Sequence, residues 1–500
     1  MDQTTLAASL TIITKDLRAS SESAWIAGAY FLTSTSFQLL YGRLSDIWSR
    51  KVLLVIGIWI FFFGSLAASL AQTSLQLIVF RAFTGVGGGG LMTVAQLIVS
   101  DIVPLRERGK YQGILEMDLP PELVSERLHH WMRNLLHAAE EGERKLEAVS
   151  DLAVAESEAN YDRKLVAIDF FGVVLALAGS TLLVLALTWA GGEYAWSSVH
   201  VITTLVVGIA TMAGFVLWQW KGTKVPLVTL SIFTSKLVNG AVLTMFVNGW
   251  NFLVQIYYIP SFYQLVYGYS AVKSGALLLP ITLTQTLFST LSGLVVHRTG
   301  RYRECLLIGW AVWAIGLGLI STLSSPSLGQ QIGYGLLAGF GLGNTLQPSL
   351  IAVQAGVERK HMAVVTSFRN FIRNLGGTLG LAISGTIINS AVRSSLAPYG
   401  LSRSQVQLLL DSPDRFEEAN GGQEMDALVS ELSMAYQKGF RVVFIVGAVL
   451  NAVAFVAAWV LMPQVELARP DDEELKEEGK RWGKKKVKDR KGRGQEDAQR

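Results

Sequence analysis

Charged side chains occur beside and inside long apolar runs of this sequence, where they could support ion pairing or the movement of charge. Residues 41–51 form a short charged turn between two apolar runs, with Asp46 and Arg50 within it. Arg81 precedes a glycine-rich stretch, residues 85–90, in another apolar run. Because a charged group in the hydrocarbon of a bilayer costs about 3 kcal/mol or more, such residues indicate a functional site by default.

Two further kinds of residue could act inside the apolar runs. Asp2 is the clearest acidic candidate, and it is either a functional carboxylate or a terminal charge in water. Asn248, Asn251 and Gln255 are spaced three and four apart and so share one helical face. Such amides bind a substrate or hydrogen-bond a neighbouring helix. The other substrate-binding candidates are Gln285, Asn344 and Gln347.

The composition places the chain in the membrane class. Half of the residues are hydrophobic, 16% are charged, and the mean hydropathy is +0.37. The basic residues gather in loops, so the net charge of +4 indicates membrane orientation rather than nucleic-acid binding. Cys305 is the single cysteine, which excludes an internal disulfide framework and favours a small buried side chain. We expect no cofactor, no metal site and no nucleic-acid partner.

The elements that must position these residues are long apolar helices. A bilayer core needs about 20 apolar residues for each helix. The first 14 residues are similar to the second half of another helix, so the chain is expected to begin inside a helix rather than with a signal peptide. Eleven full spans are predicted near 24–42, 52–71, 77–100, 166–190, 199–220, 237–260, 271–296, 304–324, 329–354, 362–392 and 439–462.

The charges of the loops predict the orientation of these spans. Alternation places basic loops around 43–51, 104–165, 221–236, 297–303 and 355–361 on one side, while the opposite loops carry almost no Lys or Arg. By the positive-inside rule the basic side is cytoplasmic, and both ends of the complete form lie there.

Three polar stretches interrupt the apolar pattern. Residues 115–165 are too charged to cross a membrane and are expected to lie on the cytoplasmic face as amphipathic helix. Residues 396–437 are expected to form a long outer loop that contains a short helix. The tail, 463–500, is expected to be a solvated cytoplasmic segment, with contact to anionic lipid as the alternative for its basic part.

Motifs along nearly the whole chain follow one family pattern. They include MDQTT at 1–5, the loop at 42–51, RAFTGVGGGG from Arg81, DIVPLRERGKYQG at 101–113, residues 164–196, residues 274–280, SGLVVHRTGRYR within 292–303, residues 339–347 and SFRNFIRNLGGTLG at 367–380. In these motifs the chain resembles the major facilitator superfamily. Within it, the chain resembles the fungal fourteen-helix proton antiporters, which include multidrug exporters and vacuolar basic amino acid transporters.

The resemblance has two departures. The family has two further helices between Gly113 and Lys164, where this chain has its hydrophilic segment, and Ser49 replaces the glycine expected before Arg50. Losing a pair of helices preserves the orientation of every later span. We therefore expect an incomplete N-terminal bundle, as in a shortened gene product.

The resemblance implies an all-α polytopic membrane protein with the major facilitator fold, built from two pseudo-symmetric helix bundles. The expected parts are an N-terminal bundle at 1–114, the hydrophilic segment at 115–165, two linker-type helices at 166–220, a six-helix C-terminal bundle at 221–462 and the charged tail at 463–500.

The resemblance also implies roles for single residues. Asp2 and Arg81 are expected to couple transport to protons. Arg369 and Arg373 share a helical face near the inner membrane surface, where we expect them to pair across the gate rather than to bind substrate. The residues expected to hold the cytoplasmic gate shut are Gly42, Asp46, Arg50 and Lys51 in the first half and Gly293, Arg298, Gly300 and Arg301 in the second.

The implied function is transport of a small organic solute by alternating access, as proton-coupled antiport. Multidrug or toxin efflux and vacuolar amino acid uptake both remain open, as do the plasma and vacuolar membranes. The competing interpretation is a membrane protein that has lost transport together with the two helices. A membrane-embedded enzyme is disfavoured because no cluster of His, Asp and Glu lies inside the spans.

Overall fold

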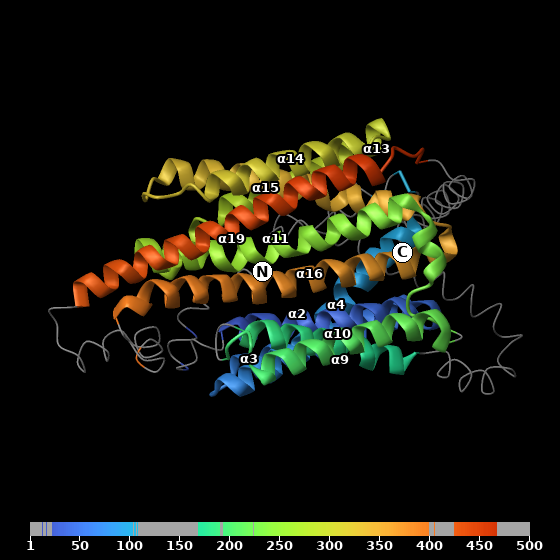
Figure 1. The fold of residues 1–500 in the computed structure, drawn as a ribbon. Helices are drawn as coiled ribbons and strands as arrows, with labels where there is room; N and C mark the ends of the chain where they lie inside the picture. The colour runs from blue at the N-terminus through green and yellow to red at the C-terminus, as the bar shows by residue number, and fades with distance from the viewer. Residues whose placement is uncertain are drawn as a thin grey trace, which may run out of the picture.

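The computed structural model describes residues 13, 17, 23–103, 105–106, 108, 169–190, 194–223, 225–399, 405 and 425–467. This part of the chain is almost entirely helical, and the all-α fold expected from the sequence is confirmed. Figure 1 shows the helices running side by side in two groups, with α11 and α16 between the outer helices.

The first group lies together at one side of Figure 1. Its members are α2 (Ser23–Ile47), α3 (Arg50–Ser69), α4 (Ser74–Ile102), α9 (Phe170–Trp189) and α10 (Val199–Leu217), which ends in the π-helical turn Trp218–Gly222.

The second group is built from the rest of the described chain. Its helices are α11 (Lys236–Tyr267), α12 (Ala271–Ala276), α13 (Leu279–Thr299), α14 (Arg303–Ile320), α15 (Leu328–Ala355), α16 (Met362–Leu396) and α19 (Met425–Leu461). Short 3-10 turns stand at Leu230–Thr234, Arg359–His361 and Ala397–Tyr399.

Ten described helical segments are long and apolar enough to cross a membrane. They coincide with ten of the eleven predicted spans. The eleventh span, near 24–42, corresponds to α2, which is helical over a bilayer length but more polar. Its polar side chains are buried, since Ser34, Thr35, Ser36 and Gln38 are at most 2% exposed. The helix therefore hides its polar face against other helices instead of showing it to lipid.

The predicted bounds are wrong at three helices. α11 runs on to Tyr267 rather than ending near 260, and the span near 271–296 is interrupted between α12 and α13. α19 begins at Met425, so the predicted outer loop at 396–437 ends earlier than expected. Polar residues extend this helix because they bond its neighbours: Ser433 donates to the Val266 carbonyl at 3.3 Å and Gln437 to that of Leu323 at 3.3 Å.

Helix ends follow the residues that the sequence supplies there. The Thr73 hydroxyl accepts the Gln76 N–H at 3.3 Å and caps α4. Gly268 and Gly300 end α11 and α13 in the left-handed region, with φ of 64° and 72°. A side chain is strained in that conformation, which is why glycine stands at both ends.

Large apolar side chains cover the outer faces of the helices. Trp59, Phe62 and Phe63 on α3 and Val453 and Trp459 on α19 are each more than half exposed to the surroundings of the protein. Such a surface is costly in water and favourable against lipid tails, which fits a protein that lies in a bilayer.

Glycines on α4 allow it to contact two helices at once. A Cβ at Gly85 or Gly89 would collide with the backbone of α2, and one at Gly87 would collide with the backbone of α3. The glycine-rich run therefore packs helices rather than binding a nucleotide.

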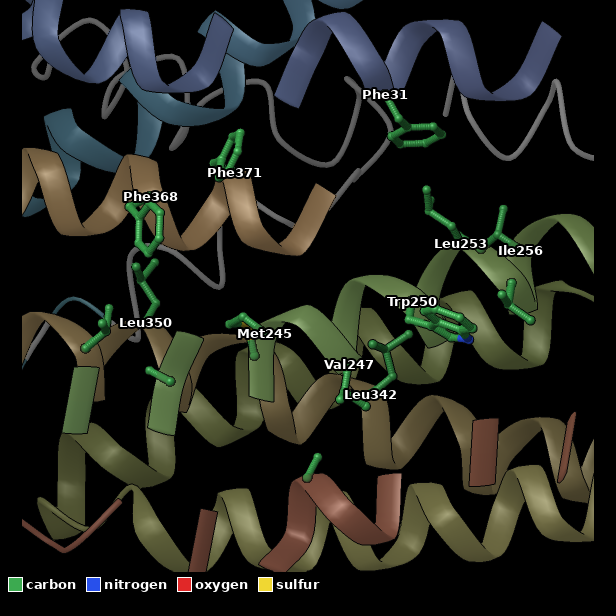
Figure 2. Close-up of a cluster of buried hydrophobic side chains, with 14 of the residues drawn as sticks. Phe31, Met245, Val247, Trp250, Leu253, Ile256, Leu342, Leu350, Phe368 and Phe371 are labelled. Atoms are coloured by element: carbon green, nitrogen blue, oxygen red, sulfur yellow. The ribbon is translucent and has the colours of Figure 1, made fainter. Parts of the chain in front are cut away.

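An analogous close contact joins α11 to α16. A Cβ at Gly249 would overlap the backbone carbonyl of Arg373, and one at Gly376 would overlap that of Phe246. Figure 2 shows the apolar side chains around this contact, with Phe31 of α2 pointing toward Leu253 and Ile256 of α11. Residues of the two groups thus meet beside the α11 and α16 pair.

Asp169 is a buried carboxylate that the sequence analysis did not single out. Its oxygens accept hydrogen bonds from the Gly172 N–H at 2.8 Å, the Trp218 indole at 2.9 Å and the Gln219 amide at 2.7 Å. Three donors compensate for the burial of the charge, and they tie the start of α9 to the turn after α10.

Residues after α19 bind the loop between α13 and α14. Gln464 donates to the Gly300 carbonyl at 2.8 Å, and its side-chain oxygen accepts the Tyr302 N–H at 3.2 Å. The Tyr302 hydroxyl donates to the Pro463 carbonyl at 2.6 Å and accepts the Val465 N–H at 3.0 Å. Burial raises the pKa of Tyr302 to about 12, which favours the protonated hydroxyl that makes both bonds.

Candidate functional site

A cavity of about 270 Å³ lies between the two groups of helices. Phe61 and residues of α2 and α4 form one wall, and residues of α11 and α16 form the other. The lining residues are Tyr30, Phe31, Ser34, Phe61, Gly88, Leu91, Met92, Phe252, Arg373 and Asn374.

Arg373 is the charged residue in the described lining. Its Nε donates to Asn248 Oδ1 at 2.8 Å, and its guanidinium carbon lies 4.6 Å from the ring centroid of Phe252. Asn248 in turn donates to the Thr345 hydroxyl at 2.9 Å. Residues of α11 and α15 thus orient the cation, and an aromatic face stabilises it.

Polar and aromatic contacts of α2 complete the opposite wall. Asn374 Nδ2 donates to Ser34 Oγ across the two groups at 3.3 Å. The Arg81 guanidinium carbon stands 5.0 Å from the ring centroid of Tyr30, which lines the cavity. Arg81 itself is 3% exposed. The cavity therefore has a second buried guanidinium behind its Tyr30 wall.

One end of the helix bundle carries a set of arginines; we call it the basic end, defined by Arg50, Arg106, Arg298 and Arg359. There the segment after α4 reaches the second group. Arg106 donates to the carbonyls of His297 and Arg298, both at 2.9 Å, at the end of α13. Unsatisfied carbonyls at a helix C-terminus attract cations, so Arg106 caps a helix of the other group.

Arg108 makes a second link at the basic end. It is 1% exposed, donates to the Val103 carbonyl at 2.9 Å in its own segment and donates to Gln354 Oε1 on α15 at 3.0 Å. Gln354 also donates to the Thr366 hydroxyl at 3.1 Å. Arg108 therefore joins the end of α4 to α15 and, through Gln354, to α16.

The predicted gating residues of the first half lie at the basic end. Gly42 sits against Ser367 of α16, with no room for a Cβ. Arg50 forms an ion pair with Asp101 at 2.8 Å, which links the start of α3 to the end of α4. Lys51 follows in α3, and Asp46 is on the last turns of α2, its side chain outside the described part.

The predicted gating residues of the second half lie in and after α13. Gly293 is buried, and Gly300 ends the helix and bonds Gln464. Arg298 contributes its carbonyl to Arg106, while the exposed Arg301 lies 3.6 Å from Glu304. Arg298 thus contacts the segment after α4 through its backbone carbonyl.

The six amide candidates are not among the described residues that line the cavity. Asn248 stands directly behind it and holds Arg373. Asn251 donates to Asn451 Oδ1 at 2.7 Å and so joins α11 to α19, whereas Gln255 donates to the Asn251 carbonyl at 3.0 Å within α11. Asn344 donates to the Phe340 carbonyl at 2.9 Å. Gln347 is buried on α15, and Gln285 is partly buried on α13.

Arg369 and Arg373 share a face of α16 but have different surroundings. Arg369 donates to the Leu346 carbonyl and to Ser349 Oγ, both at 2.9 Å, inside the second group. Arg373, one turn further along, is in the cavity wall instead of at the gate. Sequence reasoning placed the two together because it could not say which neighbour each would meet. Asp2, the hydrophilic segment 115–165 and nearly all of the tail lie outside the described residues.

Sequence reasoning missed most of the cavity lining. Tyr30, Phe31, Ser34, Phe61 and Phe252 lie within predicted spans, where residue type alone does not mark a cavity. One available signal was Ser34, which is one of several adjacent small polar residues in α2.

Comparison with known proteins identifies the family to which this chain belongs. Citrate exporter 1 of Yarrowia lipolytica is 30% identical to this chain over 471 residues, which cover 91% of this chain and 70% of that protein. A sequence model described as Major Facilitator Superfamily matches residues 1–117. This chain belongs to the major facilitator superfamily. The efflux pump FUS6 of Gibberella fujikuroi is also similar to this superfamily member, at 28% identity over 91% of this chain and 85% of the pump.

A solved structure agrees with the fold of this major facilitator protein. A bacterial homologue of the human lysosomal transporter Spinster, in an inward-facing and unoccupied conformation, superposes with a TM-score of 0.55. The alignment covers 92% of this chain and 94% of that chain at 16% identity. The expected major facilitator fold is therefore confirmed, and its family relatives are transporters rather than enzymes. The chain is accordingly a multi-pass membrane protein of a transporter family.

Proposed function

We propose that this chain exports a small organic solute by alternating access, in exchange for protons. The observation that carries the proposal is the cavity of about 270 Å³ between the two groups of helices. A binding site at the interface of two helix bundles is reached from either side of the membrane as the bundles rock about it.

The contacts at the basic end support this mechanism. Arg106 and Arg108 both bond residues of the second group, so they would have to separate for the cavity to open at that end. A state closed at one end is one of the two states that alternating access requires. In the other state these contacts are broken and the opposite end of the bundle is closed.

The direction and membrane of transport belong to the same proposal. The basic end faces the cytoplasm by the positive-inside rule. The Yarrowia relative is named as an exporter and the Gibberella relative as an efflux pump, which favours efflux over vacuolar amino acid uptake. The membrane is the plasma membrane or, for sequestration, the vacuolar membrane.

Proton coupling is proposed for Asp2 and Arg81. Asp2 supplies the titrating carboxylate. Arg81, held beside Tyr30 in the cavity wall, lowers the cost of the charged form of a nearby carboxylate. We also assign the chain to the fourteen-helix branch, with α9 and α10 as its linker helices and with two helices of the N-terminal bundle replaced by the hydrophilic segment.

The test is solute flux in liposomes that contain the purified full chain. With labelled citrate and a fluorescent cationic dye as probes, we expect transport of at least one of them to follow an imposed pH difference and to stop when a protonophore removes it. Combining Asp2→Asn with Arg81→Ala should abolish this coupling. The exposed Arg441 of α19 offers a control, because Arg441→Gln changes a charge away from the cavity.

Two results would contradict the proposal. Flux that is unchanged by the Asp2 and Arg81 substitutions would eliminate the coupling mechanism. A folded protein that moves neither probe, with or without a pH difference, would favour the non-transporting interpretation. Sequencing the transcript across codons 110 to 166 shows directly whether the complete message encodes two more helices.

A further inference from the structure

The charge of the cavity points to a class of solute, an inference that rests on the proposed transport function. Of the ten described lining residues, Arg373 alone carries a charge. The polar remainder consists of Ser34, Asn374 and the Tyr30 hydroxyl, and all of these can donate hydrogen bonds. No carboxylate stands among the described lining residues. The wall as described thus offers a cation and donors.

The guanidinium of Arg373 is held in place before a solute arrives. Asn248 Oδ1 accepts its Nε–H at 2.8 Å, and the Phe252 ring lies under it at 4.6 Å. A planar guanidinium presents its N–H groups as a fork that matches the two oxygens of a carboxylate or sulfonate. Prior orientation lowers the entropy lost on binding, so the site suits an anion better than a mobile lysine would.

The rest of the lining suits an apolar body attached to that anion. Phe31, Phe61, Leu91 and Met92 surround the space opposite the arginine. Gly88 on α4 leaves room for the Tyr30 side chain, which packs directly against it. The lining therefore combines one cation with several apolar side chains.

The second buried arginine adds to the same field. Arg81 is 3% exposed, and its guanidinium carbon lies 5.0 Å from the ring centroid of Tyr30, one of the lining residues. A second positive charge near the cavity favours an anion over an organic cation.

We infer that this cavity binds an organic anion, a small solute with a carboxylate or sulfonate at Arg373 and an apolar body against Phe61, Leu91 and Met92. Organic cations, including basic amino acids, are expected to bind this site more weakly than organic anions.

The test compares ligands of similar ring size and different permanent charge. Benzenesulfonate is the anion, benzyltrimethylammonium the cation and benzamide the neutral compound. The readout is the thermal unfolding midpoint of the purified full chain, which rises when a ligand binds the folded state. We expect the wild type to be stabilised by benzenesulfonate and unchanged by benzyltrimethylammonium.

Substitutions of Arg373 then assign the effect to the cavity. Arg373→Gln should weaken binding of the sulfonate about tenfold or more, since a hydrogen bond to a charged group is lost. Arg373→Lys keeps the charge without the fork and should retain part of the affinity. Arg369→Gln is the matched control, because Arg369 lies one turn away on α16 and is bonded inside the second group. This variant should have a lower thermal unfolding midpoint but should still be stabilised by the anion in preference to the cation.

The outcomes separate this inference from the transport proposal. Stabilisation by the cation or the neutral compound but not by the anion overturns the inference, as does anion binding that survives Arg373→Gln. No stabilisation by any of the three also overturns it, whatever flux is measured. Selective anion binding without flux in liposomes would keep this inference and contradict transport.

Discussion

At the scale of single residues, surroundings rather than residue type decide what each charge does. Arg369 and Arg373 are the same residue on one face of α16, yet Arg369 bonds Leu346 and Ser349 while Arg373 lines a cavity. Asn248 and Asn251 differ in the same way, because Asn248 holds the cavity arginine and Asn251 bonds Asn451. A buried polar group is satisfied by whatever the packing brings near it.

The ion pair between Arg50 and Asp101 is expected to add little stability. Their side chains are 23% and 42% exposed and 2.8 Å apart. Pairs this exposed contribute about 0.2 to 1 kcal/mol, and less at high salt. A double-mutant cycle with Arg50→Gln and Asp101→Asn, measured by thermal unfolding in detergent, should give a coupling of that size.

A second, more exposed pair serves as the comparison. Arg301 and Glu304 are 70% and 56% exposed and 3.6 Å apart, so their coupling should be smaller still. If the Arg50 pair couples by several kcal/mol, or the Arg301 pair couples more strongly, our account of both pairs is wrong.

At the scale of helices, glycines set how closely neighbours approach. Gly249 of α11 meets the backbone carbonyl of Arg373 on α16, so this contact also sets the distance between Arg373 and Asn248. Without a hydrophobic force between helices in lipid, close packing of this kind is a main source of their association.

Gly249→Ala should therefore destabilise the α11 and α16 contact. The added methyl group would push the helices apart, and overpacking of this kind costs about 1 to 3 kcal/mol. Thermal unfolding of the purified variant measures the loss, and binding of benzenesulfonate should weaken together with it.

Gly318 of α14 is the matched control. It is also a helical glycine, but a Cβ there meets nothing within 4 Å. Gly318→Ala should be neutral or slightly stabilising, because alanine is the better helix former. Equal losses at the two glycines would show that helix propensity, not the α11 and α16 contact, controls stability.

At the scale of the whole molecule, the basic end is held shut by backbone carbonyls as well as side chains. Arg106 bonds the carbonyls of His297 and Arg298, and Arg108 bonds Gln354. These contacts join the end of α4 to α13 and α15. In the alternating-access mechanism that we propose, they favour one of the two states, and opening the basic end requires breaking them.

Removing these contacts should shift the protein toward a state open at the basic end. A hydrogen bond to a charged group contributes about 1.5 kcal/mol or more, and Arg106→Ala with Arg108→Gln removes three such bonds, so the ratio of states should change by at least about tenfold. The change can be measured with spin labels at Val52 of α3 and Val295 of α13, two exposed residues, in a Cys305→Ser background. A state open at the basic end should appear as a population with a longer distance between the two labels.

Arg303 provides the control for this experiment. It also donates to a backbone carbonyl, that of Trp459 at 2.8 Å, but within the second group. Arg303→Gln should leave the distance distribution unchanged. A distribution that shifts equally in both variants, or in neither, would exclude a specific role for the contacts between the two groups.

The sequence by itself determined where the membrane helices lie. All eleven predicted spans correspond to helices. An apolar run of bilayer length can be recognised in the local sequence, whichever helices it later packs against. Gly42 and the glycine run of α4, both part of the motifs found in the sequence, each pack against a neighbouring helix.

Only the tertiary structure decided which polar residues face the cavity. Asn248 and Asn251 share one face of α11, yet packing against α15, α16 and α19 divides that face between the cavity arginine and interhelical bonds. The partner of Arg106 is likewise a pair of backbone carbonyls, which residue types do not reveal. Spacing along a helix says which residues share a face, but the element packed against that face determines what they touch.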